Sequence, residues 1–294
     1  MSNGSPGVNV PGVLLTPPTI GLFSAADALG TSVETDNTVL GIDQTLGAVE
    51  RWGSGIHWQG DGALSANDQI VCSSGLAFAL PVPPSQVNAF PYTTYGAWSC
   101  STYQTGLLPE YIDHARRRHL AFEQFAVERE LFSDTLAIGN AKLSGAGSNA
   151  VEVSPIALTP YKAFARLEAA FAAAYPAPFM LHITPLVFSL LQGVSSSQFT
   201  QRGNVWVTGL GNIVVVGRGY SGNGPTGTAA SAIKQWIYAS TPVQVARGQI
   251  MTLADPVQTV NRLTNDKAVY SFRLDLATFN NVDVPPMAYP VDIS

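Results

Sequence analysis

The chain has 294 residues, of which 46% are hydrophobic and only 12% are charged, and its formal net charge is -5. This length and apolar content can bury a large core, which excludes disorder along the whole chain. Charged residues make up about a quarter of an ordinary soluble domain, so much of the surface of this protein is expected to lie against a partner. A membrane-spanning helix needs about 20 consecutive apolar residues, and no run in this chain approaches that length, so the expected partner is protein and not lipid.

The charges are distributed unevenly along the chain. Up to His114, Arg51 is the only basic residue and stands against nine acidic ones, whereas the remainder carries 14 basic and 11 acidic residues. The run Arg116-Arg117-Arg118 is too short for the basic patch or arm with which proteins hold nucleic acid. An acidic, sparsely charged chain can still enclose DNA without gripping it.

The amino terminus and the cysteines indicate a protein that works in the cytoplasm, where it is made. Residues 1–6 have neither a basic start nor an apolar segment, so no secretory signal is predicted. Cys72 and Cys100 fit no metal-ligand spacing and are expected to be reduced.

The first 109 residues are predicted to be largely extended. Residues 1–40 are rich in Gly, Pro, Ser and Thr, and their prolines prevent regular helix, so we expect an arm that lies on a neighbouring subunit. Residues 41–109 combine aromatic and small polar residues with Gly and Pro, which indicates short strands and a long projecting loop. The alternative is the β-rich half of a single compact domain.

A long amphipathic helix is predicted from Tyr111 to about Leu136. Phe122, Phe125, Phe132 and Leu136 fall on one helical face, and the other positions carry charged residues. At 1.5 Å per residue this helix would be roughly 35 to 40 Å long.

The second half of the chain mixes helices and strands without a βαβ repeat. Thr159-Pro160 and Thr184-Pro185 each signal a helix start, and residues 178–183 between the two helices indicate a buried strand. Strand signals follow at 205–207, 213–216 and 236–245, and residues 270–276 alternate apolar with polar. The predicted class is therefore α+β.

No motif supports catalysis, a cofactor or a metal. The glycine-rich run Gly217–Gly222 matches a dinucleotide-binding pattern, but no helix signal follows it, so a flexible loop is the better interpretation. His114 and His119 are five residues apart and share no helical face as a metal pair would. His182, within a strand, is expected to be a satisfied core histidine. We therefore predict no enzyme activity.

The region from Tyr161 to Ser294 resembles the carboxy-terminal part of major capsid proteins of tailed bacteriophages. The resemblance rests on the helix Tyr161–Tyr175, the unit Phe179–Pro185, the passage from Gly203 to Gly217 and the segment Trp236–Val243. It implies a tailed-phage capsid fold and self-assembly into the pentamers and hexamers of an icosahedral head around double-stranded DNA.

On this resemblance the chain divides into the parts of a capsid subunit. These are an N-terminal arm (1–40), an extended-loop region (41–109), a spine helix (110–138), the first part of a peripheral domain (139–200), an axial-domain region (201–235) and returning strands with the C-terminus (236–294). Residues 52–109 contain no Lys, so a shell without Lys–Asn cross-links is predicted. No charged helical extension precedes the arm, which predicts a separate scaffold or none, and an unprocessed amino terminus.

The resemblance also predicts partners and a set of assembly residues. The partners are further copies of the chain, a portal, and a scaffold or decoration protein, in a virion assembled in the host cytoplasm without a membrane. The residues expected at subunit contacts are Tyr92, Tyr95, Trp98, Arg116, Arg117, Arg118, Glu128, Arg129, Arg218 and Tyr220.

Three other functions remain open. Encapsulin compartments share this fold and would enclose enzymes instead of a genome. A minor head or decoration protein would bind a shell without forming one. A dinucleotide-dependent enzyme would use the glycine-rich run.

Overall fold

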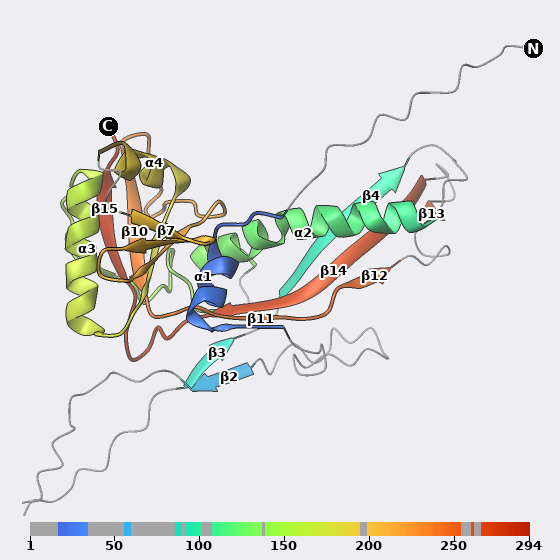
Figure 1. Ribbon diagram of the computed structural model, residues 1–294, viewed down its shortest axis with the longest axis horizontal. Helices are drawn as coiled ribbons and strands as arrows, with labels where there is room; N and C mark the ends of the chain where they lie inside the picture. Colours follow the sequence, from blue (N-terminus) through green and yellow to red (C-terminus); the bar gives the residue numbers. More distant parts are fainter. Residues whose placement is uncertain are drawn as a thin grey trace, which may run out of the picture.

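The structure, a computed structural model, describes residues 17–34, 56–59, 86–89, 92–100, 108–136, 139–194, 199–253, 260–261 and 266–294. Its helices are α1 (Leu22–Leu29), α2 (Leu108–Ser133), α3 (Pro160–Ala174) and α4 (Pro185–Val194). The molecule is elongated: α3 and α4 belong to a globular part at one end, and α2 projects from that part toward the other end (Figure 1).

A seven-stranded sheet forms the centre of the globular part, with strand order β5-β15-β10-β6-β9-β8-β7. The pairs β6–β9 and β5–β15 are parallel, and the other neighbours are antiparallel. The strands are β5 (Val151–Glu152), β6 (Met180–Ile183), β7 (Phe199–Arg202), β8 (Val205–Thr208), β9 (Ile213–Val216), β10 (Lys234–Ser240) and β15 (Met287–Asp292).

Both faces of this sheet are buried in apolar clusters. Successive residues of β10 alternate between them, because side chains of a strand point to opposite faces. Ile237 packs in the cluster that includes Phe171 of α3 and Leu191 of α4. Tyr238 packs in the other cluster, with Leu131 near the end of α2 and with residues of α1. The sheet thereby anchors one end of the long helix.

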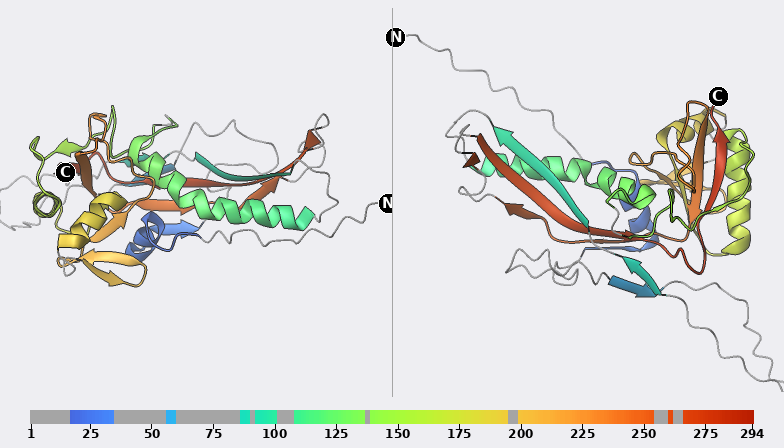
Figure 2. Two further views of the ribbon diagram at one scale, coloured as in Figure 1. Left: turned by 90° about the horizontal axis from the view of Figure 1, so that it is seen from above. Right: turned by 180° about the vertical axis from the view of Figure 1, so that it is seen from behind.

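A six-stranded sheet is centred on the long strand β14 (Asp266–Thr278). It contains the path β1 (Ser32–Glu34), β11 (Gln244–Arg247), β14 and β12 (Met251–Leu253), and β4 (Tyr92–Cys100) and β13 (Val260–Asn261) also pair with β14. A separate pair is formed by β2 (Ile56–Gln59) and β3 (Gln86–Ala89). Seen from behind, β4 and β14 run together beside α2, away from the globular part (Figure 2).

The α+β class predicted from the sequence is confirmed. The helices expected after Thr159 and Thr184 begin at Pro160 and Pro185, because proline suits the first helical turn, where its missing N–H is not needed. The long helix is confirmed with ends at Leu108 and Ser133. Most residues of the predicted arm and extended loop lie outside the described part of the chain. Within residues 1–40 the expectation of no regular helix is wrong, because α1 begins at Leu22, beyond the last proline of that region.

The apolar face that the sequence predicts for α2 is largely exposed. Phe122 and Phe125 are 52% and 40% exposed, and Leu136 beyond the helix is also exposed, whereas Phe132 alone of that set is buried. The buried side of the central helix carries His119 and Glu123 instead. The reason is that partners on β11 and β14 satisfy these polar groups, so the helix packs through ion pairs and hydrogen bonds at this level.

Candidate assembly surface

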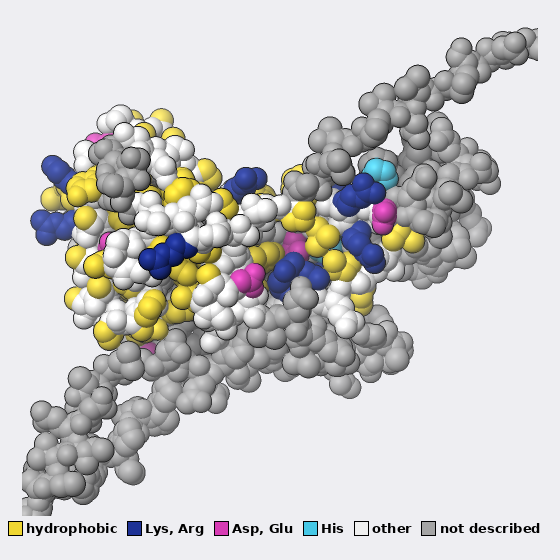
Figure 3. All heavy atoms as spheres, viewed as in Figure 1, with side chains coloured by type: hydrophobic (Ala, Val, Ile, Leu, Met, Phe, Trp, Pro, Cys, Tyr) yellow, Lys and Arg dark blue, Asp and Glu magenta, His cyan; other side chains and the backbone are white. Residues whose placement is uncertain are grey.

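The exposed side of α2 carries two phenylalanines framed by two arginines. Arg118, Phe122, Phe125 and Arg129 follow one another at steps of four, three and four residues, so they share one helical face. We call these four residues the outer stripe. All four are exposed, and the Arg129 guanidinium carbon lies 6.0 Å from the centroid of the Phe125 ring. Figure 3 shows hydrophobic side chains interspersed with Lys and Arg over this helix.

The rest of the basic run is also at the surface. Arg116 and Arg117 are exposed, and Arg117 Nη2 lies 3.4 Å from Asp113 Oδ2, one turn away. Neither Arg118 nor Arg129 makes an ion pair with any residue that the structure describes. Within the described part of the chain, the stripe therefore presents positive charge without an ion-pair partner beside apolar surface.

The opposite side of α2 is held by a buried carboxylate. Glu123 Oε2 lies 2.9 Å from Arg247 Nη2 on β11, and Glu123 Oε1 lies 3.0 Å from Arg273 Nη1 on β14. Burial acts to raise the pKa of Glu123, but hydrogen bonds and charge from Arg247, and then from Arg273, outweigh it and lower the pKa. The carboxylate is thus kept ionised between two cations.

A second set of hydrogen bonds holds the same side of α2, one turn before Glu123. His119 Nε2 lies 2.7 Å from Thr94 Oγ1, and Thr94 Oγ1 donates to Asp275 Oδ2 at 2.7 Å. On the other side of the ring, Nδ1 lies 3.1 Å from Ser271 Oγ. Together with the Glu123 ion pairs, these contacts join α2 to β4, β11 and β14, and we call the seven residues the buried clamp: Thr94, His119, Glu123, Arg247, Ser271, Arg273 and Asp275.

Burial shifts the pKa values of His119 and Asp275 in the clamp away from their ordinary values. It lowers the pKa of His119 to about 4, against the attraction of Glu123, so the imidazole is neutral near pH 7. Burial raises the pKa of Asp275 to about 8, and the negative charge of Glu123 raises it further. Near neutral pH the clamp therefore contains one ionised and one protonated carboxyl group.

A second buried carboxylate fixes α1 and the glycine-rich run to α2. Glu128 is fully buried; Oε1 accepts a hydrogen bond from Leu22 N at 3.1 Å and Oε2 accepts one from Gly219 N at 3.0 Å. Burial raises the pKa of Glu128 to about 7, although these backbone donors oppose the shift. Glu128 was expected at a subunit contact, but its carboxylate lies inside the subunit and is bonded there.

The first half of the glycine-rich run is packed against α2, whereas the sequence predicts a flexible loop there. A Cβ added to Gly219 would lie 2.6 Å from Arg129 N and 2.9 Å from Glu128 Cβ, so only glycine allows this approach. Residues 221–233 continue as turns and irregular structure with no helix. Gly219 therefore serves close contact with α2, and the run is not followed by the helix that a dinucleotide-binding motif requires.

Tyr220 also belongs to the interior. Its ring stacks on Phe132 at 5.0 Å between centroids, and its hydroxyl lies 2.9 Å from His182 Nδ1. His182 Nε2 lies 2.8 Å from Ser240 Oγ, which confirms the prediction of a satisfied core histidine. Tyr220, like Glu128, thus stabilises the subunit from within, while the neighbouring Arg218 is exposed.

The three aromatic residues predicted at subunit contacts lie on β4. Tyr92, Tyr95 and Trp98 pair with β14 opposite Asp275, Phe272 and Val269, respectively. Their side chains lie outside the described part of the structure. Four of the ten expected assembly residues are exposed arginines on α2: Arg116, Arg117, Arg118 and Arg129. A fifth, Arg218, precedes Gly219, which contacts the same helix.

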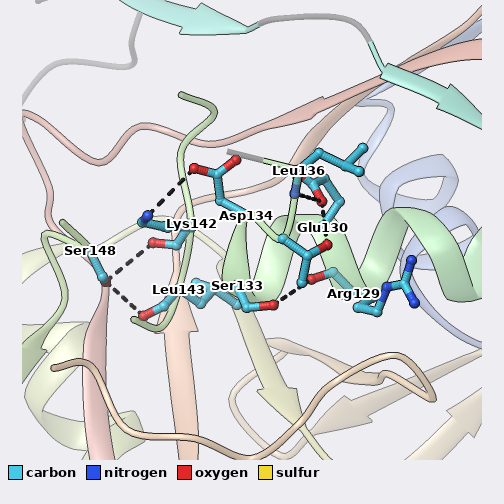
Figure 4. A network of polar contacts seen from close by, with 9 residues as sticks. Arg129, Glu130, Ser133, Asp134, Leu136, Lys142, Leu143 and Ser148 are labelled. Carbon is cyan, nitrogen blue, oxygen red and sulfur yellow. Dashed lines mark hydrogen bonds and ion pairs between the residues drawn. The ribbon is translucent and has the colours of Figure 1, made fainter. Parts of the chain in front are cut away.

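A second polar network lies at the carboxyl end of α2 (Figure 4). Asp134 follows the helix with φ of +48°, in the left-handed region that reverses a chain after a helix. Glu130 accepts hydrogen bonds from Thr135 Oγ1 at 2.8 Å and Leu136 N at 3.2 Å, and Lys142 Nζ lies 3.4 Å from Asp134. These bonds fix the junction between the projecting helix and the globular part.

Sequence reasoning missed the buried clamp. The only local signal for it is the alternation of residues 270–276, which places Arg273 and Asp275 on the polar face of a strand. That pattern predicts a solvent-exposed face, whereas both faces of the strand are buried at 274–276. Their partner Glu123 is 124 residues from Arg247 and 150 from Arg273, and no local pattern links them.

Among the described residues, no group of three or more His, Cys, Asp or Glu could hold a metal ion. No described helix has the length and hydropathy to span a membrane.

Comparison with solved structures identifies the fold. The capsid of Ralstonia phage GP4 matches with a TM-score of 0.52 and 8% identity, over 99% of this chain and 98% of that chain. A structure of Mycobacterium phage Ogopogo matches with a TM-score of 0.51 and 13% identity, over 98% and 97%. The SrpI encapsulin of Synechococcus elongatus PCC 7942 matches with a TM-score of 0.44 and 11% identity, over 72% and 77%. The chain has the tailed-phage capsid fold.

Comparisons with protein-family models and with curated proteins find no match.

Proposed function

We propose that the chain is the major capsid protein of a tailed bacteriophage. Copies assemble into pentamers and hexamers of an icosahedral head that encloses double-stranded DNA, and the chain carries out no catalysis. The observation that carries the proposal is the outer stripe: a projecting helix, fixed by a buried clamp, that presents apolar and basic side chains outward from a capsid fold. Exposed phenylalanines at helical spacing are typical of a contact surface.

The composition supports the same function. A charged fraction of 12% leaves a surface suited to apolar and hydrogen-bonding contact with neighbouring subunits. The net charge of -5 suits a container whose wall must not bind its DNA tightly.

In this function the chain divides into the parts of a capsid subunit and acts with other head proteins. Residues 1–40 and 41–109 are the arm and extended loop, 110–138 the spine helix, 139–200 the peripheral domain, 201–235 the axial region and 236–294 the returning strands. A portal and a separate scaffold or decoration protein complete the head, which is assembled in the host cytoplasm and retained in the virion.

Electron microscopy of the purified chain, alone and with the candidate scaffold, tests the proposal. Closed shells or rings of five and six subunits are expected, and a uniformly monomeric protein under both conditions would refute it. Phe122→Ser with Phe125→Ser should abolish assembly. The matched control is Ile233→Ser, which removes a side chain of similar exposure from another surface. Packaged DNA distinguishes a phage head from an encapsulin, which would contain a cargo enzyme.

A further inference from the structure

The strand β4 lies at an edge of the six-stranded sheet. It pairs with residues 267–275 of β14, and β12 pairs with residues 270–272 of the same strand. A strand has two hydrogen-bonding sides, so β4 and β12 lie on opposite sides of β14, as Figures 1 and 2 also show. Among the described strands only β14 pairs with β4. The other side of β4 is therefore an edge with which a further strand can pair.

This edge lacks the features with which proteins normally prevent pairing between edges. Natural edge strands are short or bulged, or they carry Lys or Pro. The nine residues of β4 are in unbroken register with β14, and Tyr92–Cys100 contains no charged residue and no proline. The strands at the ends of the two larger sheets, β1, β5, β7 and β12, have only two to four residues each. Of these edges, β4 is the best suited to pairing with another chain.

The buried clamp holds β4 in place without occupying its edge. Thr94 Oγ1 lies 2.7 Å from His119 Nε2 of α2 and donates to Asp275 Oδ2 of β14 at 2.7 Å. These side-chain contacts are made on one face of the strand, whereas the backbone edge lies in the plane of the sheet. The strand is thus positioned within its own subunit, and pairing with a partner requires little further ordering.

The sequence of β4 is suited to pairing with a second copy of the same strand. In an antiparallel pair related by a two-fold axis, a charge near the axis on one copy lies near the same charge on the other, and like charges weaken the pair. β4 carries no charge. Its midpoint is Gly96, and a glycine within a strand permits the close approach of another backbone.

We propose that two copies pair through β4, antiparallel and with Gly96 of each at a two-fold axis, so that two six-stranded sheets join into one. At about 3.4 Å per residue, the paired strands share roughly 30 Å of edge. The contact is isologous, because both copies use the same surface. This inference rests on the proposed shell function and deepens it: rings of five and six subunits need contacts between rings to close a shell, and an icosahedral shell has two-fold axes where such contacts fit.

Two double variants test the pairing. Positions 95 and 97 flank the axis, and each lies opposite the other in the second copy. The basic variant carries Tyr95→Lys and Ala97→Lys, and the acidic variant carries Tyr95→Glu and Ala97→Glu. Because like charges then lie opposite each other, each variant alone should associate about tenfold more weakly than the wild type. An equimolar mixture places Lys opposite Glu and should form heterodimers at least as readily as the wild type forms dimers.

Analytical ultracentrifugation of the full-length chains, below the concentration at which shells form, measures this association. Circular dichroism and thermal unfolding of each variant alone show whether the subunit remains folded. Folded variants that stay monomeric in the mixture would overturn the pairing.

Disulfide formation tests the register with smaller substitutions. In a background of Cys72→Ser and Cys100→Ser, one protein carries Tyr95→Cys and a second carries Ala97→Cys. Directly opposite residues of an antiparallel pair have Cα atoms about 4.5 to 5.5 Å apart, which a disulfide can span. Mild oxidation of the mixture should give a disulfide-linked heterodimer, whereas either protein alone should stay largely monomeric. Efficient homodimers of the Tyr95→Cys protein would overturn the register centred on Gly96.

A matched control measures random collision. Thr226→Cys and Thr228→Cys, in the same background, have the same spacing in an exposed loop. Their mixture should cross-link much less than the β4 mixture, and equal cross-linking in the two mixtures would refute the pairing.

Electron microscopy of the basic variant separates this inference from the shell function. Open rings without closed shells, under conditions in which the wild type closes shells, support β4 as a contact between rings. Shells that form as readily as those of the wild type would overturn the pairing and leave the shell function in place. If the wild type forms neither rings nor shells, the shell function fails, and the disulfide experiment still decides whether β4 pairs with its counterpart.

Discussion

Glu123 Oε1 on α2 lies 3.0 Å from Arg273 Nη1 on β14, and the same carboxylate lies 2.9 Å from Arg247 on β11. The contact joins the projecting helix to its supporting sheet in a place where most helices use apolar side chains. Removing one partner of a buried pair leaves the other charge uncompensated, which is far more costly than losing an exposed pair.

We therefore expect Glu123→Gln to lower the free energy of unfolding by about 3 kcal/mol, because two guanidinium groups lose their carboxylate. Urea denaturation of the subunit measures the change. Asp113→Asn is the matched control on the same helix: it breaks the exposed Arg117 pair and should cost less than about 0.5 kcal/mol. Equal losses in the two variants would show that the buried clamp adds no stability.

Asp275 predicts a pH dependence of stability. Its pKa is raised from 3.8 to about 8 by burial and by the charge of Glu123, so the folded subunit holds a proton that the unfolded chain releases. The associated stability is complete below about pH 4 and is lost as the pH rises to about 8. Asp275→Asn keeps a neutral side chain of the same shape, so its unfolding free energy should fall less over this range. Parallel curves for the two proteins would contradict the raised pKa.

Glu128 should contribute to the same trend at lower pH. Its pKa of about 7 is also above the ordinary value of 4.5, so its stabilising effect is lost as the pH rises between these values. Glu128→Gln should flatten the wild-type curve below about pH 7 and leave the change between about pH 7 and 8 intact. Chemical denaturation at a series of pH values measures both variants, and a curve flattened only above pH 7 would argue against this assignment.

Gly219→Ala should destabilise the subunit by about 2 kcal/mol, because the added methyl group would overlap the backbone of α2 at Arg129. Gly209→Ala is the control, since nothing lies within 4 Å of a Cβ added there. Thermal unfolding compares the two. If they melt together, the close approach of the glycine-rich run to the helix is not a feature of the folded protein.

Tyr220→Phe tests the buried histidine. The substitution keeps the ring that stacks on Phe132 but removes the hydroxyl 2.9 Å from His182 Nδ1, so a fully buried ring nitrogen loses its partner. A loss of about 1 to 3 kcal/mol in unfolding free energy is expected. The variant should retain the wild-type circular dichroism spectrum, and an unchanged unfolding free energy would refute this role for the hydroxyl.

The globular part could be predicted from the sequence because its signals are local. Thr159-Pro160 and Thr184-Pro185 mark the starts of α3 and α4, and the apolar strand between them became β6. Each signal depends on the backbone preferences of one or two neighbouring residues, which tertiary contacts here reinforce.

The orientation of α2 could not be predicted for a physical reason. Periodicity assigns residues to helical faces, but which face is buried depends on what the other elements provide. Phe122 and Phe125 form the more apolar face of the helix. The opposite face is buried because Glu123 forms ion pairs with Arg247 and Arg273, which lie more than a hundred residues further along the chain.

The pairing of β14 with β4 has a mechanical consequence. The two strands are hydrogen-bonded from Lys267 opposite Cys100 to Asp275 opposite Tyr92, while the described residues of β12 pair with β14 at 251–253. A pull along the length of β14 loads all the bonds to β4 in shear, so they must yield together. A pull across the sheet at β12 breaks its few bonds one after another. Under tension the β4–β14 pair should therefore resist extension, and β12 should separate from β14 first.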